Sequence, residues 1–187
     1  MERLLVLLLL VCAISFAANQ QDLDKLLALK QSLNTHLDLS NADLRDYPFV
    51  VGKIDLRAAN ISHSNLSKVN LANMDLSGAD LRNTDLSYAN LSGANLSNAN
   101  LTQANLLGAD LTNANLTDAE LLHAILNNAS LFKANLTRAD FACAQMNAAN
   151  LAQANVSDMI VAGANVINMN TTNVSGQIAD NNDTTRC

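Results

Sequence analysis

Residues 89–103 decide the fold of this chain, and they read Ala89-Asn90-Leu91-Ser92-Gly93-Ala94-Asn95-Leu96-Ser97-Asn98-Ala99-Asn100-Leu101-Thr102-Gln103. One five-residue unit occurs three times in this stretch: Ala, then Asn, then Leu, then Ser or Thr, then a variable residue. The unit continues in both directions, with Asp often in place of Asn. An apolar residue stands at every fifth position from Leu56 to Val166, so about two dozen units follow one another in phase.

The five-residue spacing excludes an α-helix. At about 100° per residue, a step of five residues would rotate each Leu by roughly 140°, and no apolar stripe would form. In extended chain, Ala and Leu of one unit point to the same side, and their polar neighbours point to the other. Because five is odd, the chain must turn once per unit to keep Leu inside. Short extended segments joined by regular corners close into a coil, and such coils stack at about 4.8 Å.

The A(D/N)LXX pattern from Leu56 to about Thr171 resembles the pentapeptide-repeat family and covers some three-fifths of the chain. That resemblance implies four units per coil, a square cross-section and a right-handed coil. With four units per coil, the repeats make about six coils, or roughly 28 Å of axis. We therefore expect an all-β fold, a right-handed quadrilateral β-helix (pentapeptide-repeat solenoid), with a short N-terminal α-helical cap.

Composition and charge narrow the function classes. The chain has 187 residues, 49% of them hydrophobic but only 3% aromatic, which is typical of a repeat rather than of an ordinary mixed core. Its formal net charge is −6, and no cluster of Lys and Arg occurs along it. Nucleic acids and anionic membranes bind to such clusters, so we expect neither partner.

The first residues read as an export signal. Arg3 precedes an apolar run from Leu4 to Ile14, and small residues follow at the position where a signal peptidase cleaves. The run is too short to span a bilayer comfortably. We expect a signal peptide at residues 1–17, cleaved after Ala17 or Ala18, with an uncleaved anchor as the alternative. Cys12 follows Val11 rather than a small residue, so no lipid anchor is expected.

The expected location is therefore secreted or periplasmic, or another lumenal compartment that a Sec-type signal reaches, with no stable membrane insertion after cleavage. Asn-X-Ser/Thr occurs throughout the repeats, for example at Asn90 and Asn115, and a eukaryotic secretory pathway could glycosylate many such sites. We therefore favour a bacterial exported protein.

Between the signal and the repeats, residues 18–37 are expected to form the helical cap. Leu23, Leu26, Leu27 and Leu33 have helical spacing, and Asp22 suits the N-terminal cap position. A helix there would cover the open first coil. The segment also resembles the corresponding part of exported family members from cyanobacteria and other bacteria, without the cysteine pair that some of them carry.

The two ends of the solenoid are irregular. Leu39, Leu44 and Phe49 share a five-residue phase, but Leu56 starts a phase shifted by two, so residues 38–55 must contain a bulge or loop near residues 47–52. That loop is a candidate contact site. Regular repeats then fill residues 56–173, and a polar tail follows at residues 174–187, with no capping helix. An uncovered last coil favours edge-to-edge pairing, so a homodimer through the C-terminal coil is one hypothesis.

Cysteine use leaves two alternatives open. Signal cleavage would remove Cys12 and leave Cys143 and Cys187, which are too few for a disulfide framework. Cys187 would then either lock a dimer or belong to a frayed end, and the sequence does not say whether Cys143 or Cys187 forms a disulfide.

One polar column holds the residue types of catalysis. If residues 20 apart stack, Glu120 lies near Asp140 and His123 lies near Cys143. A thiol, an imidazole and two carboxylates could form a nucleophile and base pair or half of a metal site. The column has no oxyanion donor, no pocket and no shield from water, so we expect no enzyme, no metal and no cofactor.

An apolar group is the stronger functional candidate. Large apolar side chains stand at outward positions in neighbouring coils, where they form either a protein-contact patch or unrelated scatter: Leu107, Leu122, Ile125 and Phe132. The expected function is an exported, non-catalytic scaffold for protein–protein interaction, with an unknown protein partner.

The alternative function is a DNA mimic that inhibits or protects a DNA-binding enzyme such as gyrase, as acidic members of the family do. Asn dilutes its acidic positions here, and an export signal would carry the protein away from gyrase. The acidic positions are Asp75, Asp80, Asp85, Asp110, Asp118, Glu120 and Asp140.

Overall fold

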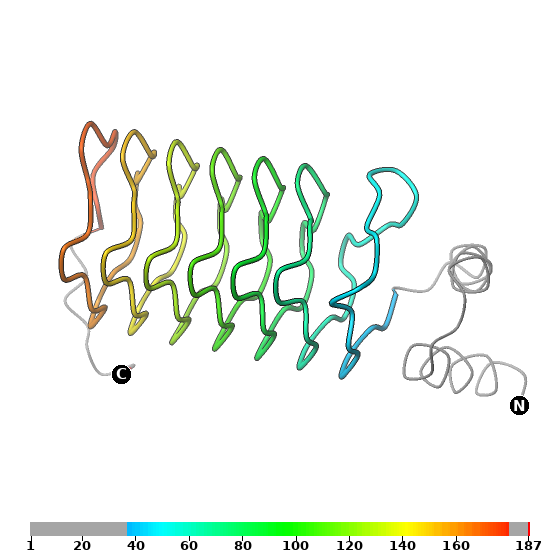
Figure 1. Cartoon of the computed structure of the whole chain (residues 1–187). Helices are drawn as coiled ribbons and strands as arrows, with labels where there is room; N and C mark the ends of the chain where they lie inside the picture. The colour runs from blue at the N-terminus through cyan, green and yellow to red at the C-terminus, as the bar shows by residue number, and fades with distance from the viewer. Residues whose placement is uncertain (1–36, 180–186) are drawn as a thin grey trace, which may run out of the picture.

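The computed structural model describes residues 37–179 and Cys187 as a straight row of stacked coils (Figure 1). The coils follow one another in chain order along a single axis. Residues 1–36, which include the predicted signal peptide and all of the predicted helical cap except Leu37, lie outside the described residues. So do residues 180–186, which are half of the polar tail.

Backbone pairing sets the size of a coil at 20 residues. Asn60 pairs in parallel with Asp80, Asp80 with Asn100, and Asn100 with Glu120. Among residues 37–179 there is no α-helix, and strand structure consists of single-residue parallel bridges with no longer strand. The chain is extended for only a few residues before each corner, which is why no continuous strand develops. No helix in this part of the chain could cross a membrane.

Each coil has four corners, in agreement with the square section expected from the family resemblance. In the coil that starts at Leu81, the carbonyls of Leu81, Leu86, Leu91 and Leu96 each accept a hydrogen bond from the N–H three residues later. The second residue between each such pair has a positive φ, for example 57° at Asn83. A bond of this span with a positive φ at that position defines a type II turn.

The core contains the two apolar residues of every unit. In the central coils both Leu and Ala are fully buried, as at Leu101 and Ala104. Leu fills the axis, and Ala lies beside the corner. Val69, Met74 and Met159 stand at the Ala position in three units and are buried as well. The predicted inward facing of both positions is confirmed.

The outward side chains of Asn and Asp stabilise the corners by hydrogen bonds to the backbone. Their side-chain oxygen accepts the N–H of the residue two positions later, as Asn100 does from Thr102 at 3.0 Å and Asp110 does from Thr112 at 2.9 Å. This local bond is an Asx turn, and it explains why the residue before Leu is so often Asn or Asp.

The first coil contains the predicted insertion. Asp38 pairs with Asn60 and Asp43 with Asn65, so this coil has 22 residues instead of 20. The extra residues widen one corner into a loop at the cyan end of the molecule (Figure 1). Tyr47 and Phe49 pack edge to face there, with ring centroids 4.6 Å apart, and Val50 and Val51 are exposed. The aromatic pair anchors the loop to the core, and the two valines lie at its tip.

Candidate binding surfaces

The outward positions of the repeat form straight columns, because each residue lies over the one 20 positions earlier. Each side of the square therefore presents three columns: the residue before Leu, the residue after it, and the corner residue. We name the four faces after the buried central residues of four successive units, which are Ile61, Leu66, Leu71 and Leu76. Units of the same face recur every 20 residues.

Two of the predicted apolar patch residues lie side by side on the Leu66 face. Asn105 and Ile125 pair across adjoining coils, and Leu107 stands two residues after Asn105. Leu107 and Ile125 are therefore 18 residues apart, on a diagonal between adjoining coils. On the next face Thr112 and Ser130 have the same separation, and their hydroxyls lie 3.0 Å apart. Leu107 and Ile125 are both half-buried, as neighbouring side chains on such a diagonal would be.

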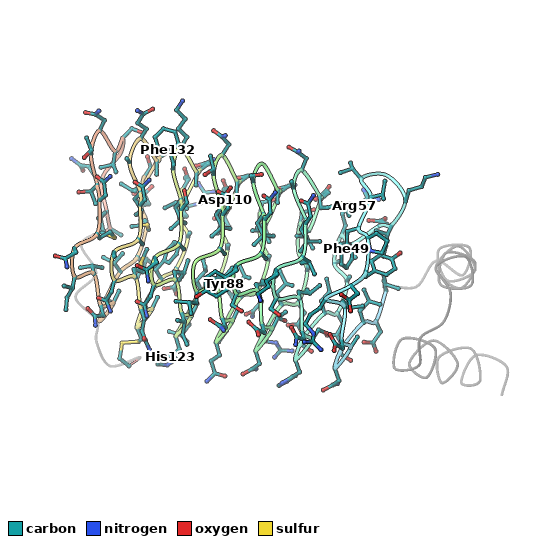
Figure 2. The ribbon with its side chains drawn as sticks, in the orientation of Figure 1. Phe49, Arg57, Tyr88, Asp110, His123 and Phe132 are labelled. Carbon is teal, nitrogen blue, oxygen red and sulfur yellow. A yellow bond between two sulfur atoms is a disulfide. The ribbon has the colours of Figure 1, made fainter. Side chains whose placement is uncertain are left out.

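The other two patch residues lie on different faces. Leu122 belongs to the Ile61 face, and Phe132 belongs to the Leu71 face, where the Lys133 ammonium lies 5.1 Å from the ring centroid of Phe132. In Figure 2 Phe132 lies at the upper edge of the molecule and His123 at the lower edge. The four residues therefore lie on three different faces of the solenoid.

The predicted polar column does stack, on the Ile61 face. Glu120 pairs with Asp140, and His123 and Cys143 both occupy corners with positive φ. Asn100 donates a 2.7 Å hydrogen bond from its amide to Glu120. Cys143, however, forms a disulfide with Cys187, so this column contains no thiol nucleophile.

Across residues 37–179 and Cys187, no group of three or more His, Cys, Asp and Glu side chains could hold a metal ion. Beside the first-coil loop there is a hollow of about 290 Å³, lined by Val51, Ile54, Arg57, Met74 and others. Its rim includes the ion pair between Arg57 and Asp55, whose atoms approach to 2.7 Å.

Arginines pair with several of the acidic residues. Arg82 donates two hydrogen bonds, of 2.8 and 2.6 Å, to the Asp80 carboxylate, and Arg45 donates an equivalent pair to Asp43. The bond from Arg82 lowers the pKa of the Asp80 carboxyl below its usual value. Arg138 reaches across one coil to Asp118 at 2.6 Å. These pairs interrupt any row of unpaired negative charge.

Tyr88, which the sequence pattern did not single out, lies on the same face as Leu107 and Ile125. Tyr88 has a φ of 58° and is 58% exposed. Its ring lies over the next corner in the column, where a Cβ on Gly108 would be only 2.7 Å from the ring. A large side chain rarely adopts a positive φ, so this position is strained. The detectable signal was an aromatic residue in the fifth, corner position of the repeat.

Comparison with known proteins establishes the family. The sequence profile of the family described as "Pentapeptide repeats" matches this chain over residues 54–93, 64–103, 94–131 and 129–166, which together exceed half of its length. The chain belongs to the pentapeptide-repeat family.

Several solved structures are similar to this chain. HetL, a pentapeptide-repeat protein involved in heterocyst differentiation regulation from the cyanobacterium Nostoc sp. strain PCC 7120, is 29% identical, with a TM-score of 0.50 over 76% of this chain and 73% of HetL. Rfr23 from the cyanobacterium Cyanothece 51142 is 25% identical, with a TM-score of 0.35 over 76% and 86%. A trypsin-treated form of the plasmid-mediated fluoroquinolone resistance protein QnrB1 is 16% identical, with a TM-score of 0.41 over 76% and 71%. A comparison with curated proteins gave no match.

This pentapeptide-repeat protein holds its C-terminus with the disulfide. Cys143 occupies a corner of the Ile61 face, and Gly163 is the corner directly over it. Cys187 Sγ lies where a Cβ on Gly163 would be, so only glycine leaves room for the bond. Cys187 therefore neither locks a dimer nor lies at a frayed end, which were the two alternatives that the sequence left open.

Proposed function

We propose that this pentapeptide-repeat protein is an exported, non-catalytic scaffold that binds another protein through the open C-terminal end of its solenoid. The observation that carries the proposal is the exposed apolar surface of the last coil. Val166, Ile167 and Ile178 are 40%, 63% and 43% exposed, whereas Met146, which lies directly beneath Val166, is fully buried.

Some backbone N–H groups of the last coil also have no backbone acceptor among the described residues. One coil earlier, the N–H groups of Met146 and Ala148 donate to the carbonyls of Asn165 and Ile167. Within the described part of the chain, the N–H groups of Val166 and Asn168 have no such acceptor. Apolar side chains beside unpaired backbone donors suit a partner that adds one more layer. A second copy of the chain is one such partner, and the predicted homodimer remains a hypothesis.

Two observations support export. Residues 1–17 have the composition of a signal peptide. The Cys143–Cys187 disulfide suits an oxidising compartment, since the cytosol keeps thiols reduced. A periplasmic or extracellular location agrees with both.

The DNA-mimic alternative has less support. Its acidic residues are spread over four faces, with Asp110 on the Leu71 face, Asp85 on the Leu66 face and Glu120 on the Ile61 face. Along the Ile61 face an Asn separates Asp80 from Glu120. DNA offers one negative charge per ~1.7 Å of axis, and these faces present no comparable row.

The export proposal is tested by fractionating the native host and measuring the mature N-terminus by mass spectrometry. A chain that starts at Ala18 or Asn19 outside the cytoplasm is the expected result. An intact Met1 in the cytoplasm would overturn export.

The binding proposal is tested with Ile167→Asp, which puts a charge into the exposed end. Partner capture from the native host by Ile167→Asp is compared with capture by wild type and by Ser97→Asp. The Ser97→Asp control introduces a charge on a face that lies away from the C-terminal end. We expect a stoichiometric partner, or a dimer in analytical ultracentrifugation, to be lost only in Ile167→Asp. Equal association of all three proteins contradicts the proposal.

A further inference from the structure

One face of the solenoid is free of charge over four consecutive coils. The units at residues 104–108, 124–128, 144–148 and 164–168 stack in register on the Leu66 face and contain no Asp, Glu, Lys, Arg or His. We call these four units the neutral face. The other three faces carry charges along the same length, for example Glu120, Lys133 and Arg138. In a chain with 28 charged side chains (11 basic and 17 acidic), this gap is a distinct chemical surface.

Tyr88 stands at the N-terminal end of the neutral face. Its ring extends over Gly108, the first corner of that face, and more than half of its surface is exposed (Figure 2). Leu107 and Ile125 continue the apolar surface along the face. An exposed aromatic ring held in a strained conformation is a feature found at ligand sites.

Amide side chains supply the polar groups of the neutral face, and the structure orients them. Asn127 Oδ1 accepts the N–H of Asn147 at 2.9 Å, and Asn147 Oδ1 accepts the N–H of Ile167 at 3.1 Å. Asn127 also donates to Gln145 Oε1 at 3.3 Å. In the described part of the chain, the corner amides of Asn128 and Asn168 make no side-chain hydrogen bond. An amide has both donor and acceptor groups, which matches a neutral hydroxyl rather than an ion.

The dimensions of the neutral face favour a single polymer chain. The extended part of one unit spans about 10 Å, and four coils at ~4.8 Å span about 19 Å, so the face covers roughly 200 Å². A stable interface between folded proteins buries ~800 Å² on each partner. The face is therefore too small for a globular protein or for a second copy packed face to face.

The backbone of the neutral face argues against an extended peptide. A peptide binds a sheet by pairing with an unpaired edge. Here the N–H groups of Leu106, Gly108 and Leu126 already donate to the coil above, so the face presents side chains and no open edge.

We infer that the neutral face binds an uncharged polysaccharide chain that runs along the solenoid axis. A sugar ring stacks on Tyr88 through its C–H groups, and the amides of Asn128, Gln145 and Asn147 hydrogen-bond to hydroxyls further along. The coil spacing of about 4.8 Å is close to the length of one pyranose unit, so successive coils meet successive sugars. Tyr88 lies at the opposite end of this face from the apolar coil end to which the protein partner is assigned, and the two surfaces share only the unit at residues 164–168. The scaffold would therefore join a protein to a glycan.

Affinity electrophoresis of the purified mature protein tests the inference. Native gels contain hydroxyethylcellulose, soluble starch or galactomannan as neutral polysaccharides, or alginate as an anionic one. The expected result is retardation by at least one neutral polysaccharide and none by alginate. If no neutral polysaccharide retards the wild type, or if only alginate does, the inference is wrong.

Tyr88→Asn removes the ring without risk to the fold, because Asn tolerates a positive φ better than Tyr. We expect affinity for the retarding polysaccharide to fall roughly tenfold, which is what loss of an aromatic contact would give. The matched control is Lys68→Asn, at the same corner one coil earlier and outside the neutral face, with a φ of 63°. Its affinity should equal that of wild type. Retention of full affinity by Tyr88→Asn would overturn the inference.

Discussion

At the scale of single residues, the corner position explains most of the departures from the consensus repeat. Every corner residue from His63 to Asn173 has a positive φ, a conformation that Gly and Asn adopt most easily. Gly78 and Gly163 occupy equivalent corners, with φ of 67° and 69°. Their surroundings differ, because only Gly163 lies against a disulfide.

Gly163→Ala should prevent the Cys143–Cys187 bond. The added methyl group would collide with Cys187 Sγ, whereas at Gly78 the nearest atom to a new Cβ is Ala58 Cβ, 3.9 Å away. Both substitutions place Ala at the same strained φ, so Gly78→Ala is the matched control. Thiol titration of the denatured proteins should find two more free thiols in Gly163→Ala than in Gly78→Ala. Equal thiol counts would show that Gly163 is not required for the bond.

Asp80 and Arg82 give a pH prediction at the same scale. Arg82 lowers the pKa of the Asp80 carboxyl, so the pair stabilises the fold above the unfolded pKa of about 3.9 and loses its effect as pH falls through the lower folded pKa. Both side chains are partly exposed, at 28% and 54%. We expect Asp80→Asn, which keeps the Asx turn, to lower the free energy of unfolding by less than ~1 kcal/mol at pH 7.

Urea unfolding of wild type and Asp80→Asn at several pH values measures the contribution of this pair. The difference between the two proteins should shrink below pH ~4 and vanish at the lower pH at which the Asp80 carboxyl is protonated in the folded protein as well. A difference that stays constant down to that pH would mean that the ion pair contributes nothing.

At the scale of the coil, the repeat tolerates a lost contact when a neighbouring coil supplies another. Ile125 and Gln145 stand where Asn or Asp would make the Asx turn. On that face Asn127 and Asn147 bond across to the next coil, to the N–H groups of Asn147 and Ile167. These bonds replace a contact within one unit by a contact between two, and only the stacked coils place the partners together.

The disulfide should stabilise the last coils specifically. It joins residues 44 apart, and the chain-entropy model assigns about 4 kcal/mol to a loop of that size. In a solenoid each coil contacts only its neighbours, so the loss should stay local. Hydrogen exchange of Cys187→Ser should be faster than wild type across residues 141–179 and unchanged across residues 81–100. Faster exchange along the whole solenoid would contradict this local effect.

At the scale of the whole molecule, stability depends on register. Parallel bridges join each residue to the one 20 positions later, so removal of one full coil leaves every other column intact. Deletion of residues 101–120 would bring Asn100 into line with Asp140, and both occupy the same column in the full chain. The shortened solenoid keeps its faces and loses only one layer of core.

A deletion of residues 101–120 should therefore fold cooperatively, with the same β-type circular dichroism and a moderately lower Tm. Deletion of residues 101–118 is the matched control, because it removes nearly as much chain but leaves two residues too many in the coil that follows Asn100. The first coil holds two extra residues as a loop at the end of the solenoid. In the middle of the solenoid we expect them to disturb the stacking on both neighbouring coils and to give a lower Tm than the 20-residue deletion. If both deletions unfold to the same extent, register does not control stability.

The sequence by itself determined the architecture of this protein. A five-residue period from Leu56 to Val166 excludes a helix, places Leu and Ala inside, and requires a corner in every unit; the shift of phase before Leu56 located the insertion. These conclusions follow from local geometry, because the residue types within each unit show which of its side chains point inward. The stacking of Glu120 on Asp140 could also be predicted, once the family resemblance supplied four units per coil.

Only the tertiary structure decided which outward residues meet. It separated Leu122 and Phe132 from the pair Leu107 and Ile125, joined Cys143 to Cys187, and showed Tyr88 lying over Gly108. The period of the sequence is five residues, but surface neighbours lie 18 or 20 residues apart, and the disulfide joins residues 44 apart, a separation that is not a multiple of the repeat. Faces, columns and the end of the solenoid exist only after the coils have stacked, and the sites proposed for this protein lie on them.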